Sequence, residues 1–377
     1  MIYADITELV GNPIRSGIQR VVRSFLSAWI HTGELKVCRF DYGAIDLVEV
    51  PEEILTLLLE QDDATKAKST KDIASEIQAI LSVSPIVKVP HEDVHLVIPE
   101  LFFDPLRVGH YQWRVTCANV KLSMLFYDFI PWLYPDAINV HRAGPLMPYL
   151  KLSTLCDNAS FISQNTYDDW RLRILHQPER RGMVLPLGAD GLDLEQQYFD
   201  RNKRDIVCLG SIDGRKNQDL IAQAFERAWE KGLTLNLVLV GYAFDKDSVA
   251  AKEIRRIGAR WPNLIHVTNA SDQDVLTILR KARATIYMSK LEGFGLPPLE
   301  SLHAGIPVVV GDGIPSLNGL PDAGQIRIGE VSVAEIEAAL WKLEDDRLMS
   351  RLWKDTQSLA LPTWDDFGRS TFEWLKS

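Results

Sequence analysis

The chain has 377 residues, of which 46% are hydrophobic and 24% charged, and its formal net charge is −10. A length of this order favours two domains, because a single hydrophobic core seldom grows so large. With 41 Lys and Arg against 51 Asp and Glu, the chain lacks the cationic excess that neutralises phosphates, which argues against general nucleic-acid binding.

The cysteines and the apolar segments restrict the class of protein further. Four cysteines are widely spaced without a C-x-x-C pair, which argues against a disulfide scaffold and a thiolate metal site. The N-terminus lacks the basic region and the long apolar core of a signal peptide, and no apolar run is long enough to span a bilayer. We therefore expect a cytoplasmic protein, whose oligomeric state the sequence leaves open.

A strand, a loop and a helix are predicted at the start of the chain. The strand covers residues 2–7, the turn-rich loop residues 10–17, and the helix residues 18–30 with Ser16 as its N-cap. Gly17 precedes the helix N-terminus, where it forms either an anion-binding loop or a simple turn. The apolar positions of the helix share one face and leave polar side chains outward at Gln19, Arg20 and Arg23.

Residues 51–95 are predicted to be peripheral. A helix over residues 52–61 is followed by a charged segment, residues 62–72, that is nearly free of large apolar groups and predicts a mobile surface insertion. Strands are then predicted over residues 94–99 and 121–128. Asp128 lies at the carboxyl end of the second strand, where open α/β sheets bind ligands, or it caps the next turn.

A strand, a turn and a helix follow at residues 159–170, and four arginines lie close behind. This basic patch is either a solvated face or a contact for anionic lipid head groups or a pyrophosphate-linked acceptor. A peripheral contact with the inner face of a membrane is therefore an open expectation. The patch consists of Arg171, Arg173, Arg180 and Arg181.

The second half of the chain repeats the alternation of strand and helix. A strand over residues 205–211 leads to Arg215 and Lys216, which precede a helix, and cations at a helix N-terminus form a strong anion site. The pattern in both halves predicts an α/β fold with two doubly wound parallel sheets. Further elements are predicted as strands over 235–241, 265–267 and 305–312, and as helices over 253–260, 272–282 and 363–375.

A buried strand over residues 284–288 leads into a loop that two carboxylates bracket. The loop glycines permit a tight turn, and the prolines at 297 and 298 suit the first turn of a following helix. Because buried carboxylates need hydrogen-bond donors, Glu292 and Glu300 predict a ligand rich in hydroxyl groups, such as a sugar.

The stretch from Glu292 to Glu300 resembles the E-x7-E signature of retaining glycosyltransferases of family 4, which have the two-domain GT-B fold. The resemblance implies that Glu292 and the neighbouring backbone amides hold the donor sugar, and that Glu300 holds the ribose of the sugar nucleotide. The loop residues implied in donor binding are Gly293, Phe294, Gly295 and Leu296.

Other segments are similar to elements of the same family. Arg215 and Lys216 resemble its phosphate-binding pair, and Asp128 resembles the aspartate of an HD-x-x-P segment in related mannosyltransferases, with Tyr127 in place of the histidine. The resemblance also implies contacts with the donor from the first loop, from the loop that follows the 205–211 strand, and from main chain near the base. These positions are Gly17, Gly210, Ser211 and Val267.

Residues 183–190 resemble the interdomain hinge of this family. The resemblance implies an N-terminal, acceptor-binding Rossmann-like domain over residues 1–188, with the C-terminal helix, residues 360–377, packing back on it. A C-terminal, nucleotide-sugar-binding Rossmann-like domain covers residues 189–359. Residues 316–319 depart from the family's S-x-x-E pattern, which leaves the role of that region open.

The resemblance implies retaining transfer of a hexose from a nucleotide diphosphate sugar to a hydroxyl of a glycan or lipid-linked saccharide, in surface polysaccharide synthesis. GDP-mannose is the favoured donor, and dTDP-rhamnose, GDP-fucose and UDP-glucose are alternatives. No cofactor or metal is expected, because the two cations and the helix N-termini stabilise the leaving diphosphate. The residues expected to act in catalysis are Glu292, Lys216, Arg215 and Asp128.

Three alternatives stay open. The first is that the chain is a non-catalytic, nucleotide-sugar-binding subunit of a glycan assembly. The second is that it is a GT-B phosphorylase or epimerase. The tripeptide Asp245-Lys246-Asp247 fits the D-x-D metal motif of the other major glycosyltransferase fold, although such tripeptides are usually loops. A dehydrogenase is not indicated, because no G-x-G-x-x-G follows a predicted strand.

Overall fold

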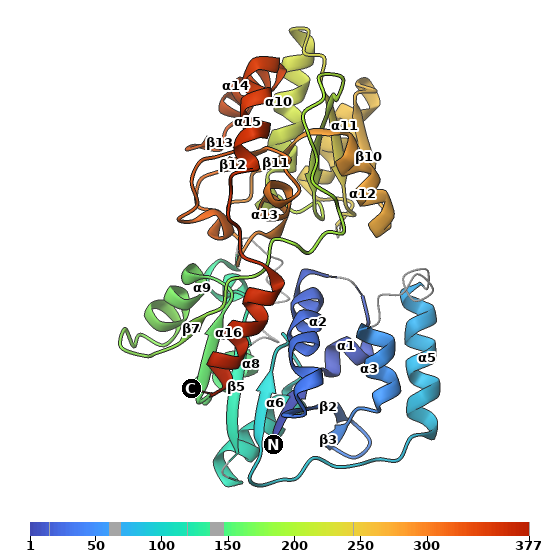
Figure 1. Cartoon of the computed structure of the whole chain (residues 1–377), viewed down its shortest axis with the longest axis vertical. Helices are drawn as coiled ribbons and strands as arrows, with labels where there is room; N and C mark the ends of the chain where they lie inside the picture. Colours follow the sequence, from blue (N-terminus) through green and yellow to red (C-terminus); the bar gives the residue numbers. More distant parts are fainter. Residues whose placement is uncertain (15, 60–68, 119, 136–146, 244, 377) are drawn as a thin grey trace. The chain divides into compact units, whose positions relative to one another are not determined.

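The computed structural model describes residues 1–14, 16–59, 69–118, 120–135, 147–243 and 245–376. The chain divides into two compact units (Figure 1). Unit 1 comprises Met1–Leu187 and Trp364–Ser377, and unit 2 comprises Gly188–Thr363.

Unit 1 is built on a seven-stranded sheet with the order β3-β2-β1-β4-β5-β6-β7. All neighbouring strands run parallel except β3, which runs antiparallel to β2. The sheet is therefore mixed at this edge, because the few residues between β2 and β3 suffice only for an antiparallel hairpin. The strands are β1 (Ile2–Asp5), β2 (Leu35–Asp41), β3 (Asp46–Glu49), β4 (His95–Ile98), β5 (Lys121–Phe126), β6 (Asn158–Phe161) and β7 (Met183–Val184).

Helices cover both faces of this sheet (Figure 1). They are α1 (Thr7–Gly11), α2 (Gly17–Trp29), η1 (Ile30–Thr32), α3 (Glu52–Leu59), α5 (Thr70–Val83), α6 (Pro105–Cys117), α7 (Ile130–Leu133), α8 (Met147–Ser153), α9 (Gln164–Asp168), the π-helix η5 (Asp169–Ile174) and α16 (Trp364–Lys376).

Two predictions for the first hundred residues need correction. Gln19 does not face outward, since only 7% of it is exposed, although Ser16 caps α2 as predicted by accepting from the Gln19 backbone N–H at 3.3 Å. Part of the predicted mobile insertion lies outside the described residues. The rest is helical from Thr70, because Ser69 and Asp72 form a capping box and two isoleucines of α5 are buried.

The C-terminal helix α16 packs on unit 1 beside α2 (Figure 1). The rings of Trp29 and Phe372 lie 4.2 Å apart between their centroids, and the Trp29 indole N–H donates to the Thr371 hydroxyl at 2.8 Å. Gly368 permits this close approach, because a Cβ there would lie 2.9 Å from the Ala28 Cβ. The aromatic residues of α16 thus serve packing.

Unit 2 is built on a six-stranded, wholly parallel sheet with the order β10-β9-β8-β11-β12-β13. The strand order reverses between β8 and β11, so loops at the carboxyl ends of these two strands flank the position where doubly wound sheets bind ligands. The strands are β8 (Asp205–Leu209), β9 (Asn236–Val240), β10 (Leu264–Val267), β11 (Ala282–Tyr287), β12 (Val308–Gly311) and β13 (Gln325–Ile328).

The core of unit 2 lies between this sheet and its helices. Every residue of β11 is buried, as expected for a central strand covered on both faces. The helices are η6 (Gly214–Lys216), α10 (Gln218–Glu230), α11 (Val249–Arg260), α12 (Asp272–Lys281), α13 (Leu296–His303), η7 (Pro315–Leu317), α14 (Val333–Glu344) and α15 (Asp346–Thr356).

Candidate functional site

Two loops at the carboxyl edge of the unit 2 sheet are joined by hydrogen bonds. The Asn217 side-chain amide donates to the Met288 carbonyl at 2.7 Å, across 71 residues of sequence. The backbone N–H of Lys290 donates to the Arg215 carbonyl at 2.8 Å. The predicted phosphate-binding loop and the predicted sugar-binding loop therefore form one loop cluster.

Lys216 lies over Gly210 in the first of these loops. Gly210 has a φ of +130°, and a Cβ at this position would lie 2.7 Å from the Lys216 Nζ. Only glycine therefore leaves room for the half-buried ammonium group. Among the ion pairs of the described residues, none includes Lys216. Its charge is thus available to an anion at the end of β8.

Arg215 is held by a neighbouring carboxylate. Asp213 accepts hydrogen bonds from the Arg215 backbone N–H at 2.9 Å and from its guanidinium at 3.1 and 3.2 Å. Burial raises the pKa of Asp213, but the hydrogen bonds from Arg215 outweigh burial and hold this pKa below its usual value. The guanidinium is therefore oriented within the loop, and its outer N–H groups are the ones that an anion would meet.

Two buried side chains that the sequence analysis missed fix the shape of this loop. The Gln218 side chain donates to the Ser211 carbonyl at 2.8 Å and accepts from the Asp213 N–H at 3.2 Å. Asn217, 2% exposed, has a φ of +53° and leads the chain into α10. Both follow the Arg-Lys pair directly, which is the only local signal that would have indicated them.

In the second loop, Glu292 is the acceptor of two hydrogen bonds. Its carboxylate accepts from the Tyr287 hydroxyl at 2.6 Å and from the Ser289 hydroxyl at 2.8 Å. Burial, and then the charge of Glu292, raise the pKa of Tyr287 well above its usual value, so this hydroxyl stays a donor. The sequence led us to expect hydrogen-bond donors for Glu292. The Tyr287 and Ser289 hydroxyls are two such donors, and they orient the Glu292 carboxylate.

The turn before α13 depends on Gly295 and Ser316. Gly295 has a φ of +87°, and a Cβ there would lie 2.8 Å from the Ile314 Cγ2. Ser316 donates its hydroxyl to the Gly295 carbonyl at 2.6 Å and its backbone N–H to the Phe294 carbonyl at 2.8 Å. The segment that departs from the family pattern therefore supports the sugar-binding loop.

Helix α13 begins at Leu296 with prolines in its first turn, as predicted. Because proline has no N–H, Leu296 supplies the first helical N–H and the next comes only from Leu299. Glu300 is 4% exposed within this helix, and Gly293 and Phe294 are buried in the turn before it. Val267 ends β10, where its carbonyl accepts from the Gly241 N–H at 2.9 Å.

Asp128 and Gly17 lie in unit 1. The Asp128 carboxylate accepts from the Ile130 N–H at 3.0 Å, so it makes the turn interaction that was one of its two interpretations. Tyr127 is buried and donates its hydroxyl to the Pro99 carbonyl at 2.6 Å. Its hydroxyl therefore does not take the place of a reactive histidine side chain. Gly17 is the first residue of α2, and a Cβ there would meet no atom within 4 Å.

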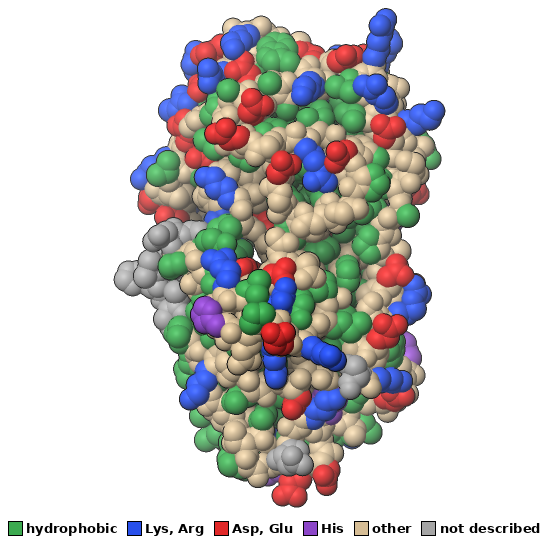
Figure 2. Space-filling view, turned by 90° about the vertical axis from the view of Figure 1, so that its left-hand side faces the viewer, with side chains coloured by type: hydrophobic (Ala, Val, Ile, Leu, Met, Phe, Trp, Pro, Cys, Tyr) green, Lys and Arg blue, Asp and Glu red, His purple; other side chains and the backbone are tan. Residues whose placement is uncertain are grey.

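Most arginines of the basic patch have partners within unit 1. Arg171 pairs with Asp168 at 2.7 Å, Arg173 pairs with Asp169 at 3.0 Å, and Arg180 donates to the Cys156 carbonyl at 2.8 Å. On the face drawn in Figure 2, Lys and Arg side chains are interspersed with Asp and Glu side chains. A continuous basic face is not visible there.

The described residues contain neither a cluster of metal-binding side chains nor a membrane-spanning helix. Among them, no group of three or more His, Cys, Asp or Glu side chains is placed to hold a metal ion. Asp245 accepts from the Asp247 N–H at 2.8 Å, which makes the D-x-D tripeptide a turn before α11. None of the described helices combines the length and the apolarity that crossing a membrane requires.

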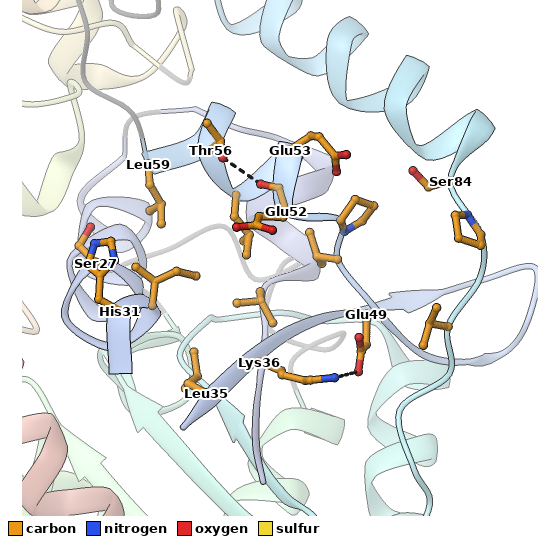
Figure 3. Close-up of a pocket in the computed structure, with 17 residues that line it drawn as sticks. Ser27, His31, Leu35, Lys36, Glu49, Glu52, Glu53, Thr56, Leu59 and Ser84 are labelled. Atoms are coloured by element: carbon orange, nitrogen blue, oxygen red, sulfur yellow. Dashed lines mark hydrogen bonds and ion pairs between the residues drawn. The ribbon is translucent and has the colours of Figure 1, made fainter. Parts of the chain in front are cut away.

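A cavity of about 890 Å³ lies elsewhere, in unit 1 between α2, β2 and α3 (Figure 3). Its wall includes the Lys36–Glu49 ion pair, with 2.7 Å between the charged atoms, and the side chains of Glu52 and Glu53. None of the residues predicted for the site lines it. The predicted site residues of unit 2 therefore gather in its loop cluster, and this cavity is separate from them.

Comparison with known proteins agrees with this geometry. Residues 192–356 match the family described as glycosyl transferases group 1. The matched residues make up most of unit 2. Both motif loops lie within it, so the predicted resemblance to glycosyltransferases is confirmed.

The chain is also similar to curated mannosyltransferases. It is 32% identical over 340 residues to the serotype-specific mannosyltransferase WbdA of Escherichia coli. The matched region covers 82% of this chain and 38% of WbdA. It is 31% identical over 161 residues to the O-antigen chain mannosyltransferase B of Escherichia coli, covering 42% of each. The chain thus spans less than half the length of these relatives.

Solved structures share the fold of this chain. Sucrose-phosphate synthase from Thermosynechococcus elongatus superposes with a TM-score of 0.67 at 15% identity, covering 100% of this chain and 98% of that one. Anabaena HepE in complex with UDP-glucose gives a TM-score of 0.68 at 13% identity, covering 100% and 99%. The predicted GT-B fold, with two Rossmann-like units, is confirmed.

Proposed function

We propose that this chain is a retaining glycosyltransferase that moves a hexose from a nucleoside diphosphate sugar to a hydroxyl of a glycan or lipid-linked saccharide, in the synthesis of a surface polysaccharide. The observation that carries this proposal is the joining of the Lys216 loop to the Glu292 loop through the Asn217–Met288 and Lys290–Arg215 hydrogen bonds. That joining brings cations for a diphosphate and a carboxylate for sugar hydroxyls to one sheet edge.

In the proposed reaction, the bond between the sugar C1 and the β-phosphate oxygen breaks while a bond from C1 to the acceptor oxygen forms. Negative charge develops on the leaving diphosphate, and Lys216, Arg215 and the helix N-termini stabilise that charge. The acceptor proton passes to the leaving phosphate on the same face of the sugar, so configuration is retained without a protein nucleophile.

The sugar is positioned by Glu292, whose carboxylate is already oriented by Tyr287 and Ser289 and can accept further hydrogen bonds. The amides of the loop that ends at Leu296 contribute donors, and Glu300 is assigned to the ribose. In unit 1, Asp128 is proposed to orient the acceptor hydroxyl, with Gly17 near the donor phosphates.

GDP-mannose is the proposed donor, because the curated relatives are named mannosyltransferases. UDP-glucose, dTDP-rhamnose and GDP-fucose are the other donors to be compared. A panel of these four is incubated with the chain and a mannose-terminated oligosaccharide, and released nucleoside diphosphate is measured. We expect GDP release with GDP-mannose, and an axial product anomer by NMR coupling constants.

A matched pair of variants assigns the activity to the loop cluster. Lys216→Ala is expected to lower kcat about 10²- to 10³-fold, the loss typical of removing one charge-stabilising donor. Lys252→Ala removes an exposed cation from α11 and is expected to leave kcat unchanged. Nucleotide binding without turnover for any donor would favour the non-catalytic subunit, and equal activity of both variants would reject the assignment of Lys216.

A further inference from the structure

A second charged depression lies in unit 2 at the opposite edge of the sheet. It has a volume of about 340 Å³ and lies where β8 and β11 begin. The residues around it are all charged or polar, namely Asp200, Asn202, Lys203, Arg204, Asp205, Arg280 and Lys281. None of the motifs assigned to the donor contributes to it.

Cations outnumber carboxylates at this depression by four to two, although the chain as a whole carries a net charge of −10. The two carboxylates have partners of their own. Asp205 accepts from the Asn236 side-chain amide at 2.9 Å, and Asp200 accepts from the Asn202 N–H at 2.9 Å. The local charge is therefore positive, although the charge of Asp200 also acts on Lys203 and opposes the lowering of its pKa.

The four cations form no close ion pair within the part of the chain that the structure describes, although Asp200 attracts Lys203 and Asp346 attracts Arg204 at longer range. No ion pair there includes Lys203, Arg204, Arg280 or Lys281. Lys203 is half-buried, with its ammonium 4.7 Å from the centre of the Trp353 ring. Burial lowers the pKa of Lys203, because it disfavours the charged form of the side chain. A bound anion would favour that charged form again.

The depression is distinct from the loop cluster with Lys216. The strands β8 and β11 run parallel, the depression lies at their starts, and the loop cluster follows their ends. Because a strand advances about 3.3 Å per residue, the two edges are separated by roughly 15 Å or more. One diphosphate cannot bridge them.

We propose that this depression, which we call the basal pocket, binds a phosphate-bearing anion. Two arginines offer planar forks of N–H donors that match phosphate oxygens, and two lysines add point charges. A volume of 340 Å³ is near the lower end of the range for ligand sites, which suits a phosphate or pyrophosphate group better than a whole sugar nucleotide. The proposal does not depend on the proposed transferase activity.

The same phosphate chemistry occurs in free pyrophosphate and in lipid head groups, and two arms of one experiment separate these sources. In the first arm, isothermal titration calorimetry measures binding of inorganic pyrophosphate to the full chain. The Lys216→Ala variant removes the donor-loop cation and is expected to keep one binding event. Arg280→Ala/Lys281→Ala, made in that background, is expected to weaken the remaining event at least roughly tenfold.

The matched control is Lys246→Ala/Lys252→Ala in the same Lys216→Ala background, which also removes two exposed cations from unit 2 but none from the basal pocket. It is expected to bind pyrophosphate like its parent. Thermal unfolding of every variant checks that the fold is kept. In addition, NMR of the lysine side chains is expected to show a higher pKa for Lys203 once pyrophosphate is bound.

In the second arm, sedimentation measures binding of the same variants to vesicles of phosphatidylcholine with and without phosphatidic acid. Binding in either arm that Arg280→Ala/Lys281→Ala weakens and the control does not supports the proposal, and the responding arm identifies the source of the phosphate. If Lys216→Ala abolishes pyrophosphate binding and no variant changes vesicle binding, the basal pocket is not an anion site. The same holds if both double variants behave alike.

Discussion

The Lys216 ammonium occupies the space that a side chain at position 210 would need, since a Cβ on Gly210 would lie 2.7 Å from Nζ. The φ of +130° at Gly210 adds a second reason for glycine, because L side chains rarely adopt it. Position 210 therefore controls where the proposed phosphate-binding charge stands.

Gly210→Ala is expected to displace Lys216 and to reduce kcat/KM about tenfold or more, with a loss of unfolding free energy of about 1–3 kcal/mol from backbone strain. Steady-state kinetics and chemical denaturation measure the two effects. Gly214→Ala, in the same loop, is the matched control, because a Cβ there meets no atom within 4 Å. Comparable losses in both variants would contradict the role of the Gly210–Lys216 contact.

The hydrogen bond from Asn217 to Met288, which joins the Lys216 loop to the Glu292 loop, can be tested by substitution. Asn217→Gly keeps the left-handed backbone but removes the hydrogen bond to the Met288 carbonyl, which is expected to cost about 1–3 kcal/mol of unfolding free energy. We also expect kcat to fall, because the phosphate-binding and sugar-binding loops then move independently. If stability falls while kcat and KM stay constant, the hydrogen bond is structural only.

The orientation of Glu292 by Tyr287 can be measured separately from its charge. Tyr287→Phe removes one donor to the carboxylate and is expected to reduce kcat/KM about threefold to tenfold, which corresponds to the usual net contribution of one hydrogen bond, about 0.5–1.5 kcal/mol. Glu292→Gln removes the charge and is expected to cost about 10²-fold. Tyr198→Phe, on an exposed residue, serves as control, and a Glu292→Gln variant with unchanged kinetics would remove Glu292 from the site.

A pH dependence of stability is expected from Glu100 in unit 1. This carboxyl is 1% exposed and accepts from the Glu8 and Leu9 N–H groups at 2.8 and 2.7 Å. Burial raises its pKa to about 8, against the partial opposition of Arg107. Because the folded state then holds a proton that the unfolded state releases above about pH 4.5, unfolding free energy falls as pH rises from 4.5 to 8, by at most about 1.4 kcal/mol per pH unit.

Denaturation curves recorded across this range in the wild-type chain and in Glu100→Gln measure that slope. The amide cannot titrate, so the variant is expected to lose this contribution and to show a flatter dependence. The slope rather than the absolute stability is the readout, since the amide also replaces one acceptor oxygen by a donor. Equal slopes in the two proteins would show that Glu100 is ionised throughout.

Removal of divalent metal provides a test of the charge-stabilisation mechanism. If Lys216, Arg215 and the helix N-termini stabilise the leaving diphosphate, turnover with GDP-mannose is expected to continue in EDTA at the rate seen with magnesium. The Lys216→Ala variant measured in the same buffers is the control for sensitivity. Loss of turnover in EDTA that magnesium restores would instead show that a metal ion stabilises the leaving diphosphate.

The elements that sequence patterns predicted well are those whose signals are local. The buried strand β11, the glycine turn and the prolines that open α13 lie side by side in the sequence, and each has its own conformational preference. The β2–β3 hairpin was not predicted, although its turn holds the typical turn residues Asp41 and Gly43, and the Asp41 carboxylate accepts from the Gly43 N–H at 3.0 Å. Gln19 was placed outward by its polarity, yet it is buried in α2.

The parts of the site that escaped prediction depend on partners distant in sequence. Gln218 and Ser316 are ordinary polar residues until the fold brings them to the Ser211 and Gly295 carbonyls. Arg215 was predicted as a phosphate ligand from its charge beside a helix N-terminus and from the family resemblance, whereas its orientation by Asp213 was not predicted. Such hydrogen bonds follow from the three-dimensional fold and carry no periodic pattern that a sequence would reveal.

The packing of α16 against α2 has a consequence for biosynthesis. Trp29 is translated 342 residues before Thr371, so its indole N–H and its ring lack their partners on α16 while unit 2 is being made. Unit 2, from Gly188 to Thr363, is continuous in sequence and can complete its fold earlier. A nascent chain thus carries an incomplete unit 1 with an uncovered aromatic surface until α16 is made, and we expect it to depend most on chaperones during that interval.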